Sequence, residues 1–225
     1  MSRETERKES NVQTYTPGIF DTELGRPMAY RLRILYKRKM KGDLENLETI
    51  NVKKFAKFIG KVFKIKVPKI RLMKRSKMEK RYRETGIYGV CEVKKRKCKK
   101  IWLEKEMVKE GDGSLVYLIL LHELRHSWQV KDYWKYYGGQ EDAPELQTLR
   151  EADAQAFAEL VMYYLFGYSY SYGDDLLVGR KQIEYEKNEI RTDLWKKIKK
   201  YYRLHGGLKG RREIRRMDKE TYRRK

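Results

Sequence analysis

The residues best suited to chemistry in this chain are His122, Glu123 and His126, which stand in the order His-Glu-x-x-His. Side chains four residues apart lie one turn apart on the same face of a helix, so two imidazoles at this spacing can reach one metal ion. A glutamate next to the first histidine can accept a proton from a water held by that ion. The pattern predicts a zinc site with two histidine ligands and Glu123 as the catalytic base.

The same five-residue pattern could also occur by chance. Two features of the sequence argue against chance. The chain contains 3 histidines, and two of them stand in this motif. The apolar run Leu115–Leu121 leads directly into the motif, so the imidazoles and the carboxylate would be costly to bury without a metal or polar partners.

A catalytic zinc site needs a third protein ligand. The remaining histidine, His205, stands 79 residues after His126. Glu151 is a more plausible ligand, because alanines at alternate positions after it would let its helix pack closely against the helix of the histidines. An ordinary surface carboxylate is the alternative interpretation of Glu151. Spacing alone leaves three competing carboxylates open, which are Glu145, Asp153 and Glu159.

Hydrophobic spacing indicates the first elements that must hold these residues in place. Between Asn51 and Pro68, apolar residues recur at steps of three and four while lysines occupy the other face, which predicts an amphipathic helix. The sequence then predicts a short strand over Val67–Met73. Residues 74–85 show no periodicity, and we expect a basic loop there.

A hairpin is predicted next, with its turn at or near Lys94–Lys97. If the turn is centred between Lys94 and Lys95, Cys91 lies directly opposite Cys98. Two reduced thiols are favoured over a disulfide or a metal pair, because the sequence shows no export signal.

Three helices are expected after the hairpin. The first would begin at Ser114, a natural N-cap, and run to about Val130. The second would begin near Pro144 and stop at Gly167. A third, basic helix is expected over about residues 181–204.

These elements predict an α+β fold, in which a small mixed or antiparallel sheet accompanies the metal helix and the helix of the third ligand. The chain would divide into an N-terminal arm (1–45), a core (46–167) and a basic helical C-terminal extension with a tail (168–225). Proline and glycine punctuate the arm, and a short strand or helix is possible near Tyr30–Tyr36.

This order of elements resembles the minimal gluzincin peptidases, especially the ImmA/IrrE-like group, over about residues 50–166. After the metal helix, that family carries a glutamate, an alanine three residues on, an asparagine or aspartate four residues on, and Phe-Ala at six and seven. The matching positions here are Glu151, Ala154, Gln155, Phe157 and Ala158. The resemblance selects Glu151 as the third zinc ligand. This chain departs from the family at Gln155, where the family residue supports a ligating histidine.

The resemblance implies peptide hydrolysis at a zinc ion, with Glu123 taking a proton from water and returning it to the leaving amine. Tyr163, Tyr164 and His205 are candidates for stabilising the oxyanion, although tyrosines at helical spacing more often serve in packing. As in related peptidases, the strand that ends near Leu103 would present its edge to an extended substrate.

The net charge of +22 is concentrated in residues 51–109, which hold 22 basic and 5 acidic residues. Residues 110–166 reverse the balance with 4 basic and 10 acidic residues. A basic surface attracts nucleic acid, acidic proteins or anionic surfaces, and sign alone does not choose among them. Three hypotheses follow: an intracellular peptidase with a protein substrate, a SprT-like DNA-associated peptidase that would need a third histidine, and a non-catalytic nucleic-acid-binding or virion protein of zincin fold.

The sequence shows no long apolar segment. Residues 1–10 are polar and charged, so no secretory signal is visible, and the longest apolar run has seven residues. We therefore expect a cytoplasmic protein without a membrane span, with virion association as an alternative. The sequence leaves the oligomeric state open.

Overall fold

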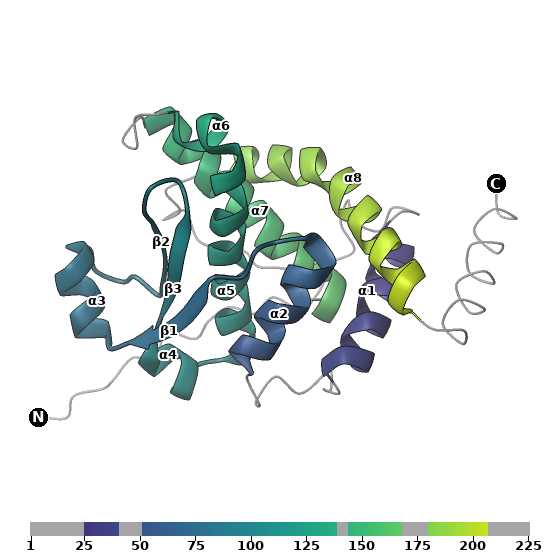
Figure 1. Cartoon of the computed structure of the whole chain (residues 1–225), viewed down its shortest axis with the longest axis horizontal. Coiled ribbons are helices and arrows are strands. Elements are labelled where there is room, and N and C mark those ends of the chain that lie inside the picture. The colour runs from purple at the N-terminus through teal and green to yellow at the C-terminus, as the bar shows by residue number, and fades with distance from the viewer. Residues whose placement is uncertain (1–24, 41–50, 139–143, 168–179, 207–225) are drawn as a thin grey trace, which may run out of the picture.

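A computed structural model describes residues 25–40, 51–138, 144–167 and 180–206 (Figure 1). It confirms the α+β class, with a three-stranded sheet set among helices. Along the chain the elements are α1 (Gly25–Met40), α2 (Val52–Phe63), β1 (Lys69–Met73), α3 (Arg75–Tyr82), β2 (Gly89–Val93), β3 (Cys98–Glu104), α4 (Lys105–Glu110), α5 (Gly113–Gln129), the 3-10 turn η1 (Val130–Asp132), α6 (Tyr133–Tyr137), α7 (Pro144–Phe166) and α8 (Arg180–His205).

The sheet is mixed and has the strand order β1-β3-β2. β1 runs parallel to β3, and β2 pairs antiparallel with it. β3 is therefore the central strand, so the prediction that the strand ending near Leu103 presents a free edge is wrong. The strand at the edge next to α5 is β2, where a Cβ added at Gly89 would lie 2.7 Å from a methyl group of Ile119.

The hairpin turn occupies Lys94–Lys97 as predicted, and its two central residues adopt positive φ angles. Its centre lies between Lys95 and Arg96, one residue later than predicted, and an irregularity at Glu92/Val93 shifts the register again. Cys91 therefore pairs with Ile101, and Cys98 pairs with Val93, so the cysteines are not the direct cross-strand partners that a turn centred between Lys94 and Lys95 would give.

The basic segment 74–85, expected to be a loop, forms the helix α3 over most of its length. One apolar side chain, Met78, anchors this helix and is fully buried. A single apolar contact gives no periodicity in the sequence, which explains why the helix was missed.

The core is continuous from α1 to α8. In α1, Met28, Leu32, Leu35 and Tyr36 form a buried helical stripe. The boundary at residue 45 therefore does not separate an arm from the core. The sequence did not reveal this stripe, because lysines and arginines stand between its apolar residues. Ile183, Leu194 and Ile198 of α8 join the same core, so the helical part of the C-terminal extension belongs to it as well. The remainder of the arm and of the extension lies outside the described residues.

Close packing of α7 against α5 brings the candidate site together (Figure 1). Ala152 and Ala156 of α7 are completely buried, as are Leu120 and Leu124 of α5. Small side chains on one helix let the two backbones approach, as the alanine-rich sequence predicted.

The ends of these two helices are also set by local side chains. Asp112 caps α5 by accepting a hydrogen bond from the backbone of Ser114 (2.9 Å), so the N-cap is two residues earlier than predicted. Gly167 ends α7 with a positive φ of 79°, as predicted. In the described part of the chain, no helix is both long and apolar enough to cross a membrane.

Candidate metal centre

The motif residues lie in the middle of α5, one helical turn apart. One ligand atom from each of His122, Glu123 and His126 can be chosen so that all three lie within 4.8 Å of one another. His126 and Glu123 are buried, whereas the side chain of His122 is 17% exposed. The site is therefore mostly enclosed but open on the side of His122.

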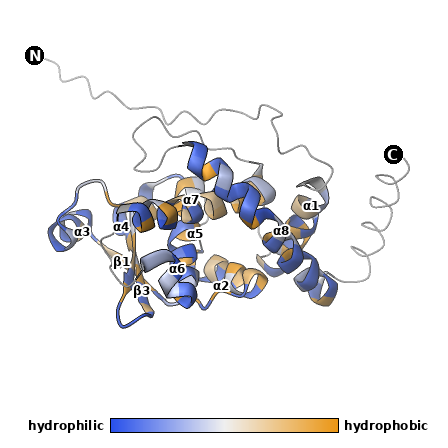
Figure 2. Cartoon of the chain, turned by 90° about the horizontal axis from the view of Figure 1, so that it is seen from above, coloured by the Kyte–Doolittle hydropathy of each residue, from blue (hydrophilic) through white to orange (hydrophobic). Residues whose placement is uncertain are grey.

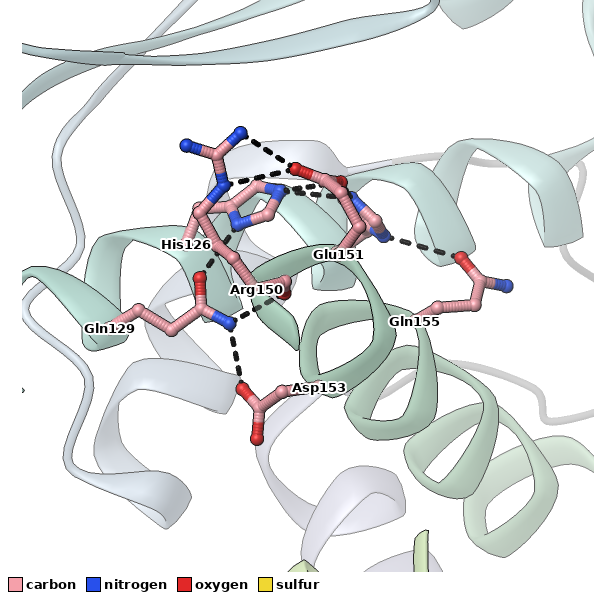
Figure 3. A network of polar contacts seen from close by, with 7 residues as sticks. His126, Gln129, Arg150, Glu151, Asp153 and Gln155 are labelled. Atoms are coloured by element: carbon pink, nitrogen blue, oxygen red, sulfur yellow. Dashed lines mark hydrogen bonds and ion pairs between the residues drawn. The ribbon is translucent and has the colours of Figure 1, made fainter. Parts of the chain in front are cut away.

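α7 brings Glu151 onto this pair of histidines. Its Oε2 lies 3.0 Å from Nε2 of His122 and 3.3 Å from Nε2 of His126. The two Nε2 atoms are 2.9 Å apart. Figure 3 shows the carboxylate of Glu151 directed at the ring of His126 from the neighbouring helix. Three electron-pair donors from two helices thus converge on one point.

Each imidazole is held from behind by a glutamine. Nδ1 of His122 lies 3.2 Å from Oε1 of Gln155, and Nδ1 of His126 lies 2.8 Å from Oε1 of Gln129. An amide oxygen only accepts hydrogen bonds, so both Nδ1 atoms carry the proton and both Nε2 lone pairs point into the site. Figure 3 shows the two glutamines on opposite sides of the cluster. This tautomer is the one that binds a metal through Nε2.

Further polar groups fix the orientation of both glutamines. Nε2 of Gln129 donates to Asp153 and to the backbone oxygen of Arg150, both at 2.8 Å. Nε2 of Gln155 donates to Glu159 at 3.0 Å, and the buried Lys187 of α8 forms an ion pair with Glu159 at 2.5 Å. Each amide therefore presents its oxygen to a histidine because its nitrogen is already engaged.

The glutamine at 155 is thus backed by a carboxylate one turn further along α7. Glu159 is 4% exposed and is linked to His122 through Gln155.

Arg150 holds the other oxygen of Glu151. Its Nε and Nη2 donate to Oε1 at 3.1 and 3.0 Å. The guanidinium also lies 5.0 Å from the centre of the Tyr137 ring. Glu151 is therefore fixed with Oε1 paired to a cation and Oε2 free to face the imidazoles.

The charges in this cluster are strongly coupled. Burial lowers the pKa of His126, but the charge and hydrogen bond of Glu151 outweigh burial and raise that pKa to about 9. Burial raises the pKa of Glu151, but the two imidazoles outweigh it and hold that pKa well below its usual range. The negative charge of Glu151 and a positive charge on His126 therefore stabilise each other.

Glu123 lies next to the two imidazoles. Its side chain is packed against β2, where a Cβ at Gly89 would lie 2.9 Å from its Cγ and 3.0 Å from its Oε1. Its Oε2 is buried without a hydrogen-bond partner. Burial raises the pKa of Glu123, against the charges of His126 and His122, which lower it. A buried carboxylate of this kind is poised to accept a proton.

The donor triangle fits a zinc ion. At zinc–ligand distances of about 2.0–2.1 Å, neighbouring ligand atoms of a tetrahedral site are about 3.3–3.4 Å apart. The observed separations of 2.9, 3.0 and 3.3 Å are slightly shorter and would need only small outward shifts. The set of two imidazoles and one carboxylate is also one that catalytic zinc sites use.

Cys91 and Cys98 lie on the face of the sheet next to α5, and both thiols are free. A hydrogen bond between the two thiols is the largest cause that raises the pKa of Cys91, and burial is the second. Cys98 also lies 3.6 Å from the backbone oxygen of Lys100.

The structure does not bring the three candidate oxyanion partners to the metal centre. Tyr163 and Tyr164 stand at the end of α7, about 18 Å along the helix from Glu151. Tyr164 is buried, and its backbone oxygen accepts a hydrogen bond from Arg33. His205 is exposed at the end of α8, with its ring 4.2 Å from that of Tyr201.

The competing carboxylates have other positions. Glu145 is exposed in the first turn of α7. Asp153 is fully buried and forms two hydrogen bonds of 2.7 Å with Arg125. Glu159 pairs with Lys187. Of the four carboxylates considered from the sequence, Glu151 is the one in contact with both imidazoles.

Several supporting residues were missed at the sequence level: Gln129, Arg150, Lys187 and Gly89. Gln129 follows His126 by three residues, a spacing that places it on the same side of the helix and could have identified it. The contacts of Lys187 and Gly89 join elements far apart in the chain, and the sequence carries no local signal for them.

Comparisons with known protein families, with curated proteins and with solved structures find no match to this chain.

Proposed function

We propose that this protein is a zinc-dependent metallopeptidase that hydrolyses peptide bonds of a protein substrate. The observation that carries the proposal is the convergence of two Nε2 lone pairs and one carboxylate oxygen beside a buried carboxylate with an unpaired oxygen. The convergence supplies a metal site, and Glu123 supplies a base next to it.

His122, His126 and Glu151 would hold the zinc ion. When bound, zinc supplies a Lewis acid that lowers the pKa of a water molecule and polarises a peptide carbonyl. Gln155 and Gln129 keep the imidazoles in the ligating tautomer, and Arg150 keeps Glu151 oriented. These contacts orient the three ligand side chains without a metal ion.

Glu123 would act as general base and then as general acid. It accepts a proton from water and returns it to the leaving amine, which is the exchange for which burial and a raised pKa suit it. Gly89 leaves room for its side chain between α5 and β2. β2 is the edge strand beside Glu123, so an extended substrate could pair with β2.

The geometry favours this function over a SprT-like peptidase. A site of three histidines would require His205, whose contacts are with Tyr201 and with Arg38 of α1. The position that His205 would fill is occupied by Glu151. A non-catalytic protein of zincin fold would need neither a buried base at Glu123 nor a space for it at Gly89.

Zinc content tests the ligand set. We expect about one zinc ion per chain in the wild type, measured by elemental analysis after purification with added zinc. Glu151→Ala should lose zinc, whereas Glu145→Ala, an exposed glutamate of the same helix, and His205→Ala should retain it. Zinc retained in Glu151→Ala but lost in His205→Ala would overturn the assignment.

Cleavage of a diverse peptide mixture, read by mass spectrometry, tests the activity. Glu123→Gln should retain zinc and abolish the cleavages that the wild type produces. Equal cleavage by both proteins would remove Glu123 from the mechanism. A zinc-loaded wild type that cleaves nothing in the mixture, or in denatured proteins, would favour the non-catalytic alternative.

A further inference from the structure

A pocket lies on the side of the sheet away from α5. Ile101 and Leu103 of β3 are buried toward the core, so Trp102 between them points to the opposite face. There, a pocket of about 610 Å³ opens between the sheet and α3. Its lining residues are Leu72, Met73, Lys74, Lys77, Lys80, Arg81, Trp102 and Lys105.

The lining of this pocket is strongly basic. Five of its eight residues carry a positive charge, and none carries a negative charge. Lys77, Lys80 and Arg81 are exposed and stand at steps of three and four on α3, so they share one face of the helix. Figure 2 shows α3 as a largely blue helix at one end of the molecule, apart from the orange faces of α2.

An aromatic ring forms part of the same lining. Trp102 is fixed by a hydrogen bond of 2.8 Å from its Nε1 to Glu92. Glu92 also pairs with Arg81 at 3.1 Å, and this guanidinium lies 5.6 Å from the centre of the indole ring. A base that entered the pocket would meet a positioned indole and a guanidinium plane, both of which stack on nucleobases.

We propose that this pocket binds single-stranded nucleic acid. The phosphates would contact Lys74, Lys77 and Lys80, and a base would stack on Trp102 beside Arg81. This site lies on the far face of the sheet from His122 and does not depend on the proposed peptidase activity.

The shape and chemistry of the lining favour a single strand over the other polyanions. A duplex offers its phosphates on a convex surface and keeps its bases stacked internally, so it could not use a recessed indole. An acidic peptide would satisfy the lysines but would gain little from an aromatic platform. Lys69, Arg71 and Lys99 on the adjoining strands extend the positive charge beyond the pocket, as a continuous polyanion requires.

Fluorescence anisotropy with a labelled oligothymidylate of about 20 nucleotides tests the proposal on the full-length chain. The double variant Lys77→Glu/Lys80→Glu should weaken binding at least about tenfold at ~0.1 M salt and lower the slope of log K against log salt by about 1.4, since each single-strand phosphate contact contributes about 0.7. The matched control is Lys57→Glu/Lys61→Glu on α2, which makes the same charge change at exposed positions. Equal losses in the two double variants would overturn the proposal, because binding would then follow net charge and not the pocket.

A second comparison separates stacking from charge. The wild type should bind the oligothymidylate more tightly than an abasic strand of the same length, and Trp102→Leu should remove most of that difference. A preference that survives in Trp102→Leu would overturn the stacking assignment. Binding of a polyglutamate peptide of equal charge as tightly as the oligothymidylate would overturn nucleic acid as the ligand in favour of an acidic protein. Circular dichroism of each variant shows whether it retains the fold.

Discussion

Two polar clusters lie along the same interface between α5 and α7, and they are built on different principles. In one cluster, Arg125 and Asp153 face each other with two hydrogen bonds of 2.7 Å, and both side chains are at most 3% exposed. In the other, Glu151 meets two imidazoles whose lone pairs point at the same place. In the first cluster each charge has a partner of opposite charge, whereas in the second the lone pairs of two imidazoles and one carboxylate oxygen converge on one point.

The difference teaches which polar groups serve the fold and which serve chemistry. Arg125 also lies 3.7 Å from the centre of the Trp128 ring, so its guanidinium has both a carboxylate and an aromatic partner. At the metal centre, Glu123 keeps a buried oxygen without a partner and the neighbouring donors converge without filling their common point. A buried carboxylate oxygen without a partner is costly, and in the proposed function Glu123 uses that oxygen for chemistry.

The largest effect should come from breaking the first cluster. Asp153→Ala would leave Arg125 buried without its partner, and we expect a loss of about 3–5 kcal/mol in the free energy of unfolding. Urea denaturation of metal-free protein measures this loss, which should exceed that of Glu151→Ala, because Glu151 is 22% exposed. If Asp153→Ala does not fold, the double variant Arg125→Met/Asp153→Leu should restore folding. A loss below about 1 kcal/mol in Asp153→Ala would contradict the contrast between the clusters.

Zinc should stabilise the second cluster and leave the first one unaffected. At free zinc about 100-fold above the dissociation constant, binding to the folded state adds about 2.7 kcal/mol. Thermal unfolding with zinc and with a chelator measures this gain. The wild type and Glu145→Ala should show the shift, and Glu151→Ala should not. A zinc-dependent shift of full size in Glu151→Ala would contradict the ligand set.

The pH dependence of the metal-free protein should report the protonation of His126 beside Glu151. The pKa of His126 is raised from 6.5 to about 9, so its contribution to stability is complete below pH 6.5 and is lost as pH rises toward 9. We expect a fall on the order of 2 kcal/mol over this range, measured by urea denaturation. In Glu151→Ala the fall should be much smaller, because the carboxylate causes the raised pKa. An equal fall in both proteins would contradict that cause.

The smallest effect should come from loosening one histidine without touching a ligand. Gln155→Leu keeps a similar volume but removes the acceptor for Nδ1 of His122, and we expect zinc affinity to fall about 10–100-fold. Competition with a chromophoric chelator measures the affinity. Gln147→Leu, at an exposed position of the same helix, is the control and should bind zinc as the wild type does. Unchanged affinity in Gln155→Leu would show that Gln155 does not support the site.

The candidate site could be identified from the sequence to the extent that its contacts repeat at helical spacing. His122 and His126 stand four residues apart on one helix, and alanines identified the face of α7 that packs against them. The network behind them could not be identified in the same way. Gln155 is linked to Lys187 through Glu159, so this network joins α7 to α8. The separation of these residues in the sequence does not indicate that their side chains are in contact.

The fold shows a similar limit. Regular periodicity predicted α2, the hairpin, α5 and α7, each of which has a continuous apolar face or a definite turn. α1 was obscured by basic residues around its buried stripe, and α3 has one buried anchor at Met78. The order of strands depends on β1 pairing with β3 across the chain, which no local pattern specifies.

The most direct test of the metal centre is a crystal structure grown with zinc, with an anomalous difference map at the zinc absorption edge. We expect one strong peak at about 2.0–2.2 Å from Nε2 of His122, Nε2 of His126 and Oε2 of Glu151, with Glu123 beside it but not bonded to it. A peak at Cys91 and Cys98 or at His205, without one between the two imidazoles, would contradict the account.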